Sequence, residues 1–167
     1  YYQFKSFLWE KITESLNSLA KEYELICIEG AGSPAEINLR DKDIVNMAVA
    51  RYAQAPVCLI GDIEKGGVFA QLYGTWALLK KDERQFLKGF IINKFRGNFV
   101  LLEPGLHAIE KLTHIPTLGV VPYSRFQLDD EDSMTEKIKV SQQFSKTADL
   151  RIGIIRFPYI SNFTDFD

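Results

Sequence analysis

The stretch "PVCLIGDIEKGGVFAQLYGTWALL", residues 56–79, decides the fold class of this chain. It opens with a continuously apolar run, which is typical of a strand that is buried on both faces of a sheet. Asp62 ends the run, and the pair Gly66–Gly67 predicts a flexible turn. The apolar residues after the turn have the spacing of a helix. A buried strand that leads directly into a helix predicts a crossover connection and therefore a parallel sheet.

The same alternation of strand and helix continues along the chain in both directions. Apolar residues at helical spacing predict helices at residues 4–19, 43–53, 67–79 and about 104–113. Continuous apolar runs predict buried strands at residues 24–30, 56–63, 89–95 and 117–123. This order predicts an α/β fold with three layers, in which helices cover both faces of a mostly parallel sheet.

The composition is typical of a globular domain. Of the 167 residues, 46% are hydrophobic and 25% are charged. The net charge of -2 and the pI near 5.8 argue against nucleic acid or an anionic membrane as a partner. No apolar run approaches the roughly 20 residues that span a bilayer. The first residues lack the order of a signal peptide, so we expect a cytoplasmic location.

The cysteines and histidines predict no metal site or disulfide. Cys27 and Cys58 lie inside apolar runs, so we expect buried, reduced thiols. His107 and His114 are seven residues apart, which on one helix is a rise of about 10 Å. One metal ion cannot be held by both across that distance, so we expect these histidines on the surface or in packing.

Polar residues follow the apolar runs of the predicted strands. Glu29, Asp62 and the pair Asn93–Lys94 stand at the ends of the first three. In open parallel sheets, ligands bind beyond the carboxyl ends of the strands. The side-chain amide of Asn93 suits a purine edge, and the ammonium of Lys94 suits phosphate or carboxylate. The sequence therefore predicts a nucleotide or metal site at this edge.

Two acidic residues each allow two interpretations. Glu29 is followed at once by glycines, which favours a ligand of a hard cation such as Mg²⁺, although its carboxylate could instead accept backbone N–H groups of its own turn. Asp43 precedes a predicted helix, which favours a helix cap, although it could also face a reaction centre. The residues alone leave both alternatives open.

One element of a nucleoside triphosphate site does not occur in the chain. A phosphate-binding loop of this type ends in Gly-Lys-Ser or Gly-Lys-Thr, because its backbone N–H groups and lysine hold the phosphates. Neither tripeptide occurs in the 167 residues. The sequence therefore carries metal-side and base-side elements without that loop.

Several longer motifs resemble one enzyme family. In chain order they are "EGAGSPAEINLRDKDIVNMAVA", "GDIEKGGVFAQLYGT", "INKFRGN", "LGVVPY", "DEDS" and "RIGIIRFPYISNFTDFD". Together they extend over nearly the whole chain and resemble the cobyric acid synthase family. The related dethiobiotin synthetases and cobyrinate a,c-diamide synthases share "EGAG" but not the full set.

The resemblance implies a synthetase in two parts. A dethiobiotin-synthetase-like domain would use ATP and Mg²⁺ to phosphorylate carboxylates of a corrinoid, adenosylcobyrinate a,c-diamide. A class I glutamine amidotransferase domain would hydrolyse glutamine and deliver ammonia, so that the b, d, e and g carboxylates become amides in cobalamin biosynthesis. Phosphorylation makes the carboxylate oxygen a leaving group, and Mg²⁺ offsets the charge in that transfer.

The resemblance also assigns roles on the nucleotide side of the predicted site. Glu29 is similar to the family's Mg²⁺ ligand, and Gly30 and Gly32 are similar to the glycines that admit phosphate and the substrate carboxylate. Asn93 and Lys94 resemble the contact with the adenine of the nucleotide.

Further residues belong to the reaction side. Asp43 and Asp62 resemble acidic residues near the reacting carboxylate and the metal, so catalytic roles are predicted for both. Arg40 and Lys65 are predicted, by charge alone, to bind carboxylates of the corrinoid. Asn98 stands where the family pattern has Asp, which weakens a charge-based role there.

The resemblance predicts three parts in the chain. Residues 1–124 are part of the ATPase domain without its phosphate-loop strand, residues 125–148 are a linker, and residues 149–167 are the first strand and loop of a truncated amidotransferase domain. The missing parts, including the phosphate loop and the glutaminase residues, would lie outside the chain, so we expect it to be inactive alone. Alternatives are another dethiobiotin-synthetase-like ATP-dependent ligase, a partition-type ATPase, or an inert nucleotide-binding fold.

Overall fold

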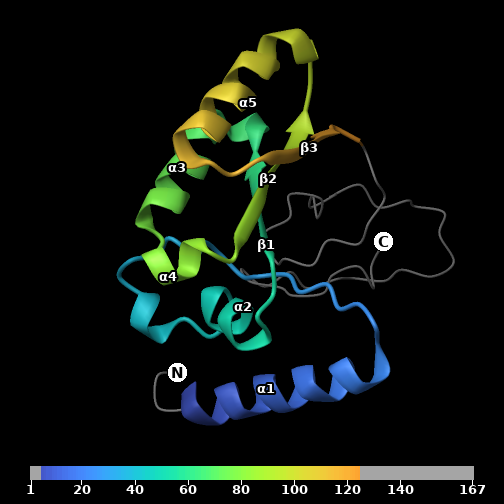
Figure 1. Cartoon of the computed structure of the whole chain (residues 1–167), viewed down its shortest axis with the longest axis vertical. Helices are drawn as coiled ribbons and strands as arrows, with labels where there is room; N and C mark the ends of the chain where they lie inside the picture. The colour runs from blue at the N-terminus through green and yellow to red at the C-terminus, as the bar shows by residue number, and fades with distance from the viewer. Residues whose placement is uncertain (1–4, 125–167) are drawn as a thin grey trace, which may run out of the picture. The chain divides into compact units, whose positions relative to one another are not determined.

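The computed structural model describes residues 5–124, and Figure 1 shows their arrangement. The strands are β1 (Val57–Asp62), β2 (Leu87–Phe95) and β3 (Thr117–Pro122). The helices are α1 (Lys5–Glu22), α2 (Met47–Ala53), α3 (Val68–Leu78), α4 (Lys81–Arg84) and α5 (Phe99–Thr113), with two 3₁₀ turns, η2 (Arg40–Lys42) and η3 (Ile63–Lys65). The predicted linker at 125–148 and the predicted strand and loop at 149–167 lie outside the described residues.

The three strands form one parallel sheet in the order β1-β2-β3. Each neighbouring pair is joined by a helical crossover, α3 between β1 and β2 and α5 between β2 and β3. In the register of the sheet, Gly61 lies beside Ile92 and Asp62 lies beside Asn93. The α/β class and the parallel sheet are confirmed, and the carboxyl ends of β1 and β2 meet as predicted.

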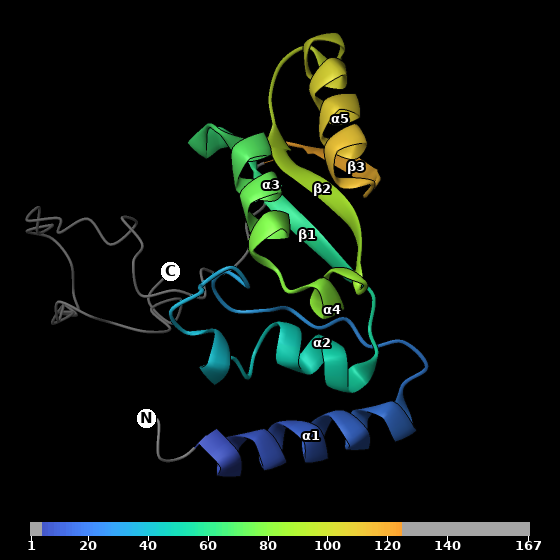
Figure 2. The same cartoon turned by 60° about the vertical axis from the view of Figure 1, so that its left-hand side comes forward.

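The core lies between the sheet and the helices α3 and α5, which run beside each other in Figure 2. Phe90 and Ile92 are two residues apart on β2, so they point to the same face, and both are fully buried. Leu72 of α3 and Ile109 of α5 complete this cluster. Gly61 allows the close approach of α3, because a Cβ atom there would lie 2.6 Å from Cγ2 of Val68.

The opposite face of the sheet is apolar and open within residues 5–124. Ile60 is 60% exposed and Leu118 is 56% exposed. Cys58, on the same face as Ile60, is also exposed, so the prediction of a buried thiol there was wrong. The apolar run around Cys58 predicted burial on both faces, but α3 and α5 pack on only one of them.

The predicted strand at residues 24–30 does not form. This segment is extended but unpaired, Leu25 is 81% exposed, and Cys27 is exposed rather than buried as predicted. A strand is stabilised by hydrogen bonds to a neighbouring strand, and no strand of the described part of the chain pairs with this segment. The apolar residues of this segment therefore do not form a strand within residues 5–124.

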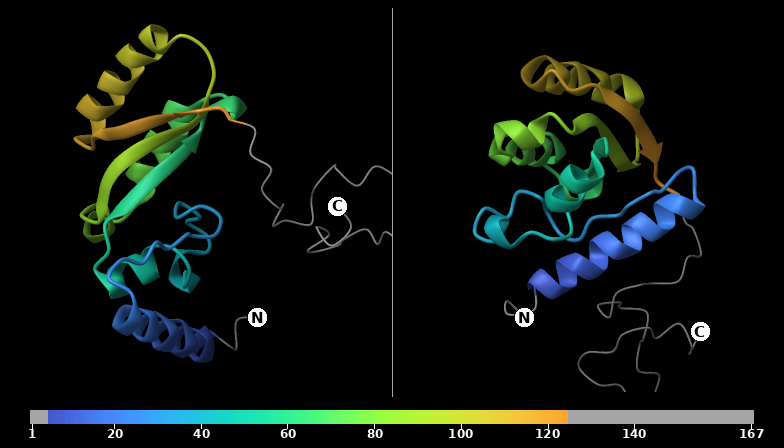
Figure 3. Two further views of the ribbon diagram at one scale, coloured as in Figure 1. Left: turned by 90° about the vertical axis from the view of Figure 1, so that its right-hand side faces the viewer. Right: turned by 60° about the horizontal axis from the view of Figure 1, so that its bottom comes forward.

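The helix α1 packs against α2 below the sheet, as Figure 3 shows. Nδ2 of Asn17 donates a hydrogen bond to the hydroxyl of Tyr52 at 2.8 Å. The ring of Trp9 meets the ring of Tyr52 edge-on, with 5.8 Å between centroids. No helix in residues 5–124 is long and apolar enough to cross a bilayer.

Two differences between the predicted and the observed helices have local reasons. The helix α5 begins at Phe99 rather than near Pro104, because the side chain of Asn98 accepts a hydrogen bond from the N–H of Val100 and caps the first turn. The short helix α4 was not predicted. It is stabilised by Glu83, whose carboxylate accepts the N–H of Lys80 at 2.8 Å.

Candidate functional site

The carboxyl ends of β1 and β2 bring together the first group of predicted site residues. Nζ of Lys94 lies 2.7 Å from Oδ2 of Asp62, and Oδ1 of Asp62 accepts the N–H of Glu64 at 3.0 Å. The hydrogen bond from Lys94 lowers the pKa of the Asp62 carboxyl below its ordinary value. The same bond raises the pKa of the Lys94 ammonium. Asp62 is therefore held as a carboxylate at neutral pH.

Asn93 turns one end of its amide toward its own backbone. Its Oδ1 accepts the N–H of Lys94 at 2.9 Å, and Lys94 has a φ of 60°, in the left-handed region that few residues other than glycine adopt. The amide nitrogen of Asn93 makes no hydrogen bond within residues 5–124, so it can donate to a ligand beyond the strand ends.

A second layer of charged residues joins the ends of all three strands. Nε of Arg96, just after β2, donates to Oε1 of Glu64 in η3 at 2.8 Å. The guanidinium of Arg96 lies 3.2 Å from the ring centroid of Tyr123, just after β3. The sequence analysis gave no role to Tyr123. Only the parallel register shows that these two residues meet.

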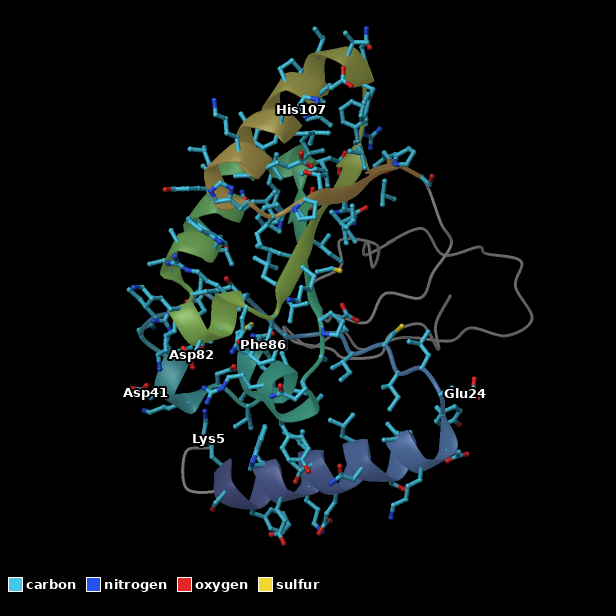
Figure 4. The ribbon with its side chains drawn as sticks, in the orientation of Figure 1. Lys5, Glu24, Asp41, Asp82, Phe86 and His107 are labelled. Atoms are coloured by element: carbon cyan, nitrogen blue, oxygen red, sulfur yellow. The ribbon has the colours of Figure 1, made fainter. Side chains whose placement is uncertain are left out.

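The second group of predicted residues lies around a cavity of about 240 Å³. The cavity is lined by the loop that follows Glu29 (residues 30–36, the glycine loop), by η2, by the start of α2 and by α4. The lining residues include Gly32, Ser33, Arg40, Lys42, Asp43 and Glu83. Lys5 of α1 also lines it, and Figure 4 shows this lysine close to η2. Glu83 is only 5% exposed, and sequence reasoning missed it.

Asp43 caps the entry to α2. Its Oδ1 accepts the N–H groups of Val45 and Asn46, at 3.0 and 2.9 Å, and its Oδ2 accepts the N–H of Ala48 at 3.0 Å. Of the two interpretations of Asp43, the helix cap is confirmed. Because Asp43 also lines the cavity, the predicted catalytic role remains a separate prediction.

The two predicted corrinoid-binding residues differ in their contacts. A terminal guanidinium nitrogen of Arg40 donates to the carbonyl oxygen of Leu78, at the end of α3. Nε of Arg40 is buried and has no hydrogen-bond partner within residues 5–124. Lys65 is exposed in η3, and its charge contributes to the lowered pKa of Asp62. Arg40 thus belongs to the cavity, whereas Lys65 belongs to the strand ends.

Glu29 lies at the end of the unpaired segment, just before the glycine loop, and its side chain is exposed. No group of three or more His, Cys, Asp or Glu side chains gathers in a metal-binding arrangement among the described residues. A lone carboxylate fits Mg²⁺ in one common mode, in which one or two carboxylates and the phosphates of a substrate share the ion. The exposed Glu29 is compatible with that mode.

The histidines lie away from both groups. His107 is exposed on α5, as Figure 4 shows, and its Nδ1 is 3.8 Å from Oε2 of Glu110 on the same helix. His114 follows α5 and is also exposed. The prediction that the histidines lie on the surface is confirmed.

A parallel α/β sheet with polar residues gathered at its strand ends defines a class of nucleotide-dependent domains. The chain belongs to the AAA domain family, whose model matches residues 5–145, and this match supports use of ATP. No solved structure matches the chain.

More particularly, the chain is similar to curated cobyric acid synthases. It is 52% identical to that of Alkaliphilus metalliredigens over 99% of the chain, 53% identical to that of Yersinia enterocolitica over 100%, and 55% identical to that of Listeria innocua over 99%. The chain spans about a third of the length of these relatives, 32–33%. The resemblance to cobyric acid synthases that the motifs indicated is confirmed.

Proposed function

We propose that this chain is one part of a cobyric acid synthase, an ATP-dependent ligase that takes ammonia from glutamine. Its substrate would be adenosylcobyrinate a,c-diamide, amidated at the b, d, e and g carboxylates in the cytoplasm. The observation that carries the proposal is the identity of 52–55% along essentially the whole chain. The remaining length of the relatives would supply the phosphate loop and the glutaminase.

Glu29 and the glycines beside it would form the metal side of the ATP site. When bound with ATP, Mg²⁺ neutralises charge on the phosphates during transfer. The exposed carboxylate of Glu29 would hold that ion. Gly32 has a φ of 65°, a conformation that favours glycine, and it would let phosphate approach the backbone next to Glu29.

The strand-end group would bind the nucleotide base and orient a carboxylate toward the reaction. The amide nitrogen of Asn93 would donate to the adenine. Lys94 would fix the Asp62 carboxylate in place, since its ammonium is bonded to that carboxylate at 2.7 Å. In this arrangement Lys94 contributes to the nucleotide side mainly through Asp62.

The cavity and Lys65 would bind the corrinoid. The carboxylate that is to be phosphorylated carries a negative charge. Arg40 and Lys42 place cations at the cavity, and Lys65 places one at the strand ends. Arg40 offers the buried Nε, which has no partner within the described residues. Asp43 would hold the start of α2 against the cavity and so shape its wall.

The proposal is tested by turnover of the full-length protein that contains this chain. We expect ADP formation that depends on the corrinoid a,c-diamide, with glutamine-dependent amidation at the b, d, e and g positions. Turnover with 7,8-diaminopelargonate or cobyrinate in place of that corrinoid would instead favour another dethiobiotin-synthetase-like ligase. Absence of ATP turnover with all of these substrates would favour an inert nucleotide-binding fold.

The metal role of Glu29 is tested separately with Glu29→Gln. We expect the Mg²⁺ concentration for half-maximal ADP formation to rise at least about 10-fold, because an ion ligand is lost. Glu24→Gln is a matched control, since Glu24 is an exposed glutamate just after α1, labelled in Figure 4. An unchanged Mg²⁺ requirement in Glu29→Gln would contradict the assignment.

A further inference from the structure

Asn46 occupies the position before the first turn of α2, where an asparagine side chain usually caps the helix. In this chain it does not, and Asp43 instead accepts the N–H of Ala48 in the first turn and the N–H groups of Val45 and Asn46 just before it. The Asn46 side chain is thereby left to interact with another part of the chain. Its Nδ2 donates to the carbonyl oxygen of Ala31 at 2.8 Å, 15 residues earlier in the sequence.

Gly30 makes this contact possible. A Cβ atom on Gly30 would lie 2.2 Å from Oδ1 of Asn46, so the amide lies directly over the glycine backbone. The φ of Gly30, unlike that of Gly32, is not in the left-handed region. Glycine is therefore required at position 30 because a side chain there would clash with Asn46, and not because of the backbone conformation. The Asn46 side chain thus lies against Gly30 and is hydrogen-bonded to Ala31, the two residues that follow Glu29.

The contact matters because the segment around Glu29 has no strand to hold it. Residues 24–30 form no ladder hydrogen bonds, and their apolar side chains are largely exposed. The hydrogen bond from Asn46 joins this segment to the start of α2, which Asp43 stabilises. The position of the Glu29 backbone is therefore coupled to α2 through one amide.

We propose that Asn46 is a positioning residue that holds residues 29–31 against α2 and so places the carboxylate of Glu29. The proposal rests on the metal role proposed for Glu29 in one respect only, its effect on Mg²⁺. The holding of the loop is a property of the chain itself and is measurable without metal.

The first test measures the loop without metal. In the full-length protein, Asn46→Asp keeps the shape of the side chain but replaces the donor with an oxygen that faces the Ala31 carbonyl. We expect the NMR order parameters of the backbone N–H groups of residues 29–33 to fall from the rigid range of about 0.85 toward the flexible range below about 0.6, because the loop loses a hydrogen bond that holds it. Asn17→Asp is the matched control, because Asn17 also donates across elements, to Tyr52 at 2.8 Å, away from Glu29. Unchanged order parameters at residues 29–33 in Asn46→Asp would overturn the proposal.

The second test uses Gly30 to probe the same contact. Gly30→Ala should displace the Asn46 amide and lower the order parameters of residues 29–33 in the same way. In the Asn46→Ala background the obstructing amide is gone, so adding Gly30→Ala should have little further effect. Equal effects of Gly30→Ala in both backgrounds would show that the two residues act independently, contrary to the proposal.

The third test measures the consequence for the metal. Asn46→Asp should raise the Mg²⁺ concentration for half-maximal ADP formation about 3- to 10-fold, while Asn17→Asp leaves it unchanged. If Glu29→Gln changes the Mg²⁺ requirement and Asn46→Asp does not, Asn46 does not place Glu29 and this inference fails. If neither substitution changes the Mg²⁺ requirement while Asn46→Asp lowers the order parameters of residues 29–33, the metal role of Glu29 fails and the holding of the loop stands.

Discussion

Asp62 and Glu29 each end an apolar run, but the structure surrounds them differently. Asp62 leaves a strand that pairs with β2, so its neighbours are set by the register, and Lys94 is bonded to its carboxylate. Glu29 leaves an unpaired segment, its side chain is exposed, and the nearest support of its backbone is the amide of Asn46 at Ala31. The strand-end group is built by a sheet, whereas the glycine loop is held by single side-chain contacts.

This difference teaches how each part of the site obtains its geometry. In the sheet, many backbone hydrogen bonds share the task of placing Asp62, and no single side chain decides it. In the loop, Asn46 and Asp43 carry that task through a few hydrogen bonds. Substitutions that disturb packing should therefore have their largest effects at the strands, and substitutions in the loop should affect stability less.

The largest expected effect comes from Gly61→Ala in β1. The new Cβ would lie 2.6 Å from Cγ2 of Val68, which is buried and β-branched, so the core must shift. We expect the free energy of unfolding to fall by about 1–3 kcal/mol. The measurement is urea denaturation followed by tryptophan fluorescence.

Two other glycines provide the controls for this prediction. Gly74 lies inside α3 with nothing within 4 Å of an added Cβ, so Gly74→Ala should raise stability by about 0.5–1 kcal/mol. In the loop, Gly30→Ala meets only the movable end of Asn46 and should cost about 0.5–1.5 kcal/mol, the value of one hydrogen bond. A larger loss for Gly30→Ala than for Gly61→Ala would reverse the comparison between the two regions.

The same contrast explains what could be predicted from the sequence. The strands at 56–63, 89–95 and 117–123 were predicted within two residues, because each apolar run is bounded by polar or turn residues and each has a neighbour in the sheet. The run at 24–30 has the same local pattern, but a strand also needs a partner from elsewhere, which local patterns do not report. Cys27 was assigned wrongly for the same reason, and Cys58 was assigned wrongly because α3 and α5 cover only one face of the sheet.

The candidate site shows the same limit at the level of single residues. Asp62, Asn93 and Lys94 were predicted as neighbours because the ends of parallel strands converge. The contact between Arg96 and Tyr123 joins residues 27 positions apart, and the hydrogen bond from Asn46 to Ala31 joins residues 15 positions apart. Only the folded chain reveals these two contacts. Glu83 lies in a polar segment of the sequence, which is typical of the surface. In the structure it is buried, and its carboxylate accepts the N–H of Lys80.

A medium effect is expected when the ion pair at the strand ends is removed. Lys94→Met takes away the hydrogen bond that lowers the pKa of Asp62, so that pKa should rise toward the ordinary value of about 3.9. Because the Lys94 side chain is 45% exposed, solvent screens the pair and the loss of stability at neutral pH should be only about 0.5–1 kcal/mol. Lys65→Met, which removes only a more distant charge, should change stability less.

The pH dependence gives this prediction its sign. In the folded chain the pKa of Asp62 is lowered, so its contribution to stability is present above its unfolded pKa and is lost as the pH falls through the folded pKa. The pKa of Lys94 is raised, so its contribution is present below its unfolded pKa and is lost as the pH rises through the folded pKa. Unfolding measured across both ranges should show weaker pH dependence at each end in Lys94→Met. An unchanged acid limb would mean that the pair has no influence on Asp62.

The smallest effect on stability is expected from Glu29→Gln, compared with Asp62→Asn. Asp62 loses a charged partner and weakens its cap on η3 when it becomes an amide, so Asp62→Asn should cost about 1 kcal/mol. Glu29 is exposed, so Glu29→Gln should stay within about 0.5 kcal/mol of the unchanged chain in urea denaturation. The two carboxylates would then have different roles. Asp62 would stabilise the fold, whereas Glu29, which contributes less to stability, is the one proposed to hold Mg²⁺. A loss of stability in Glu29→Gln as large as that in Asp62→Asn would instead mean that the Glu29 carboxylate is bound by its own turn, the second of its two interpretations.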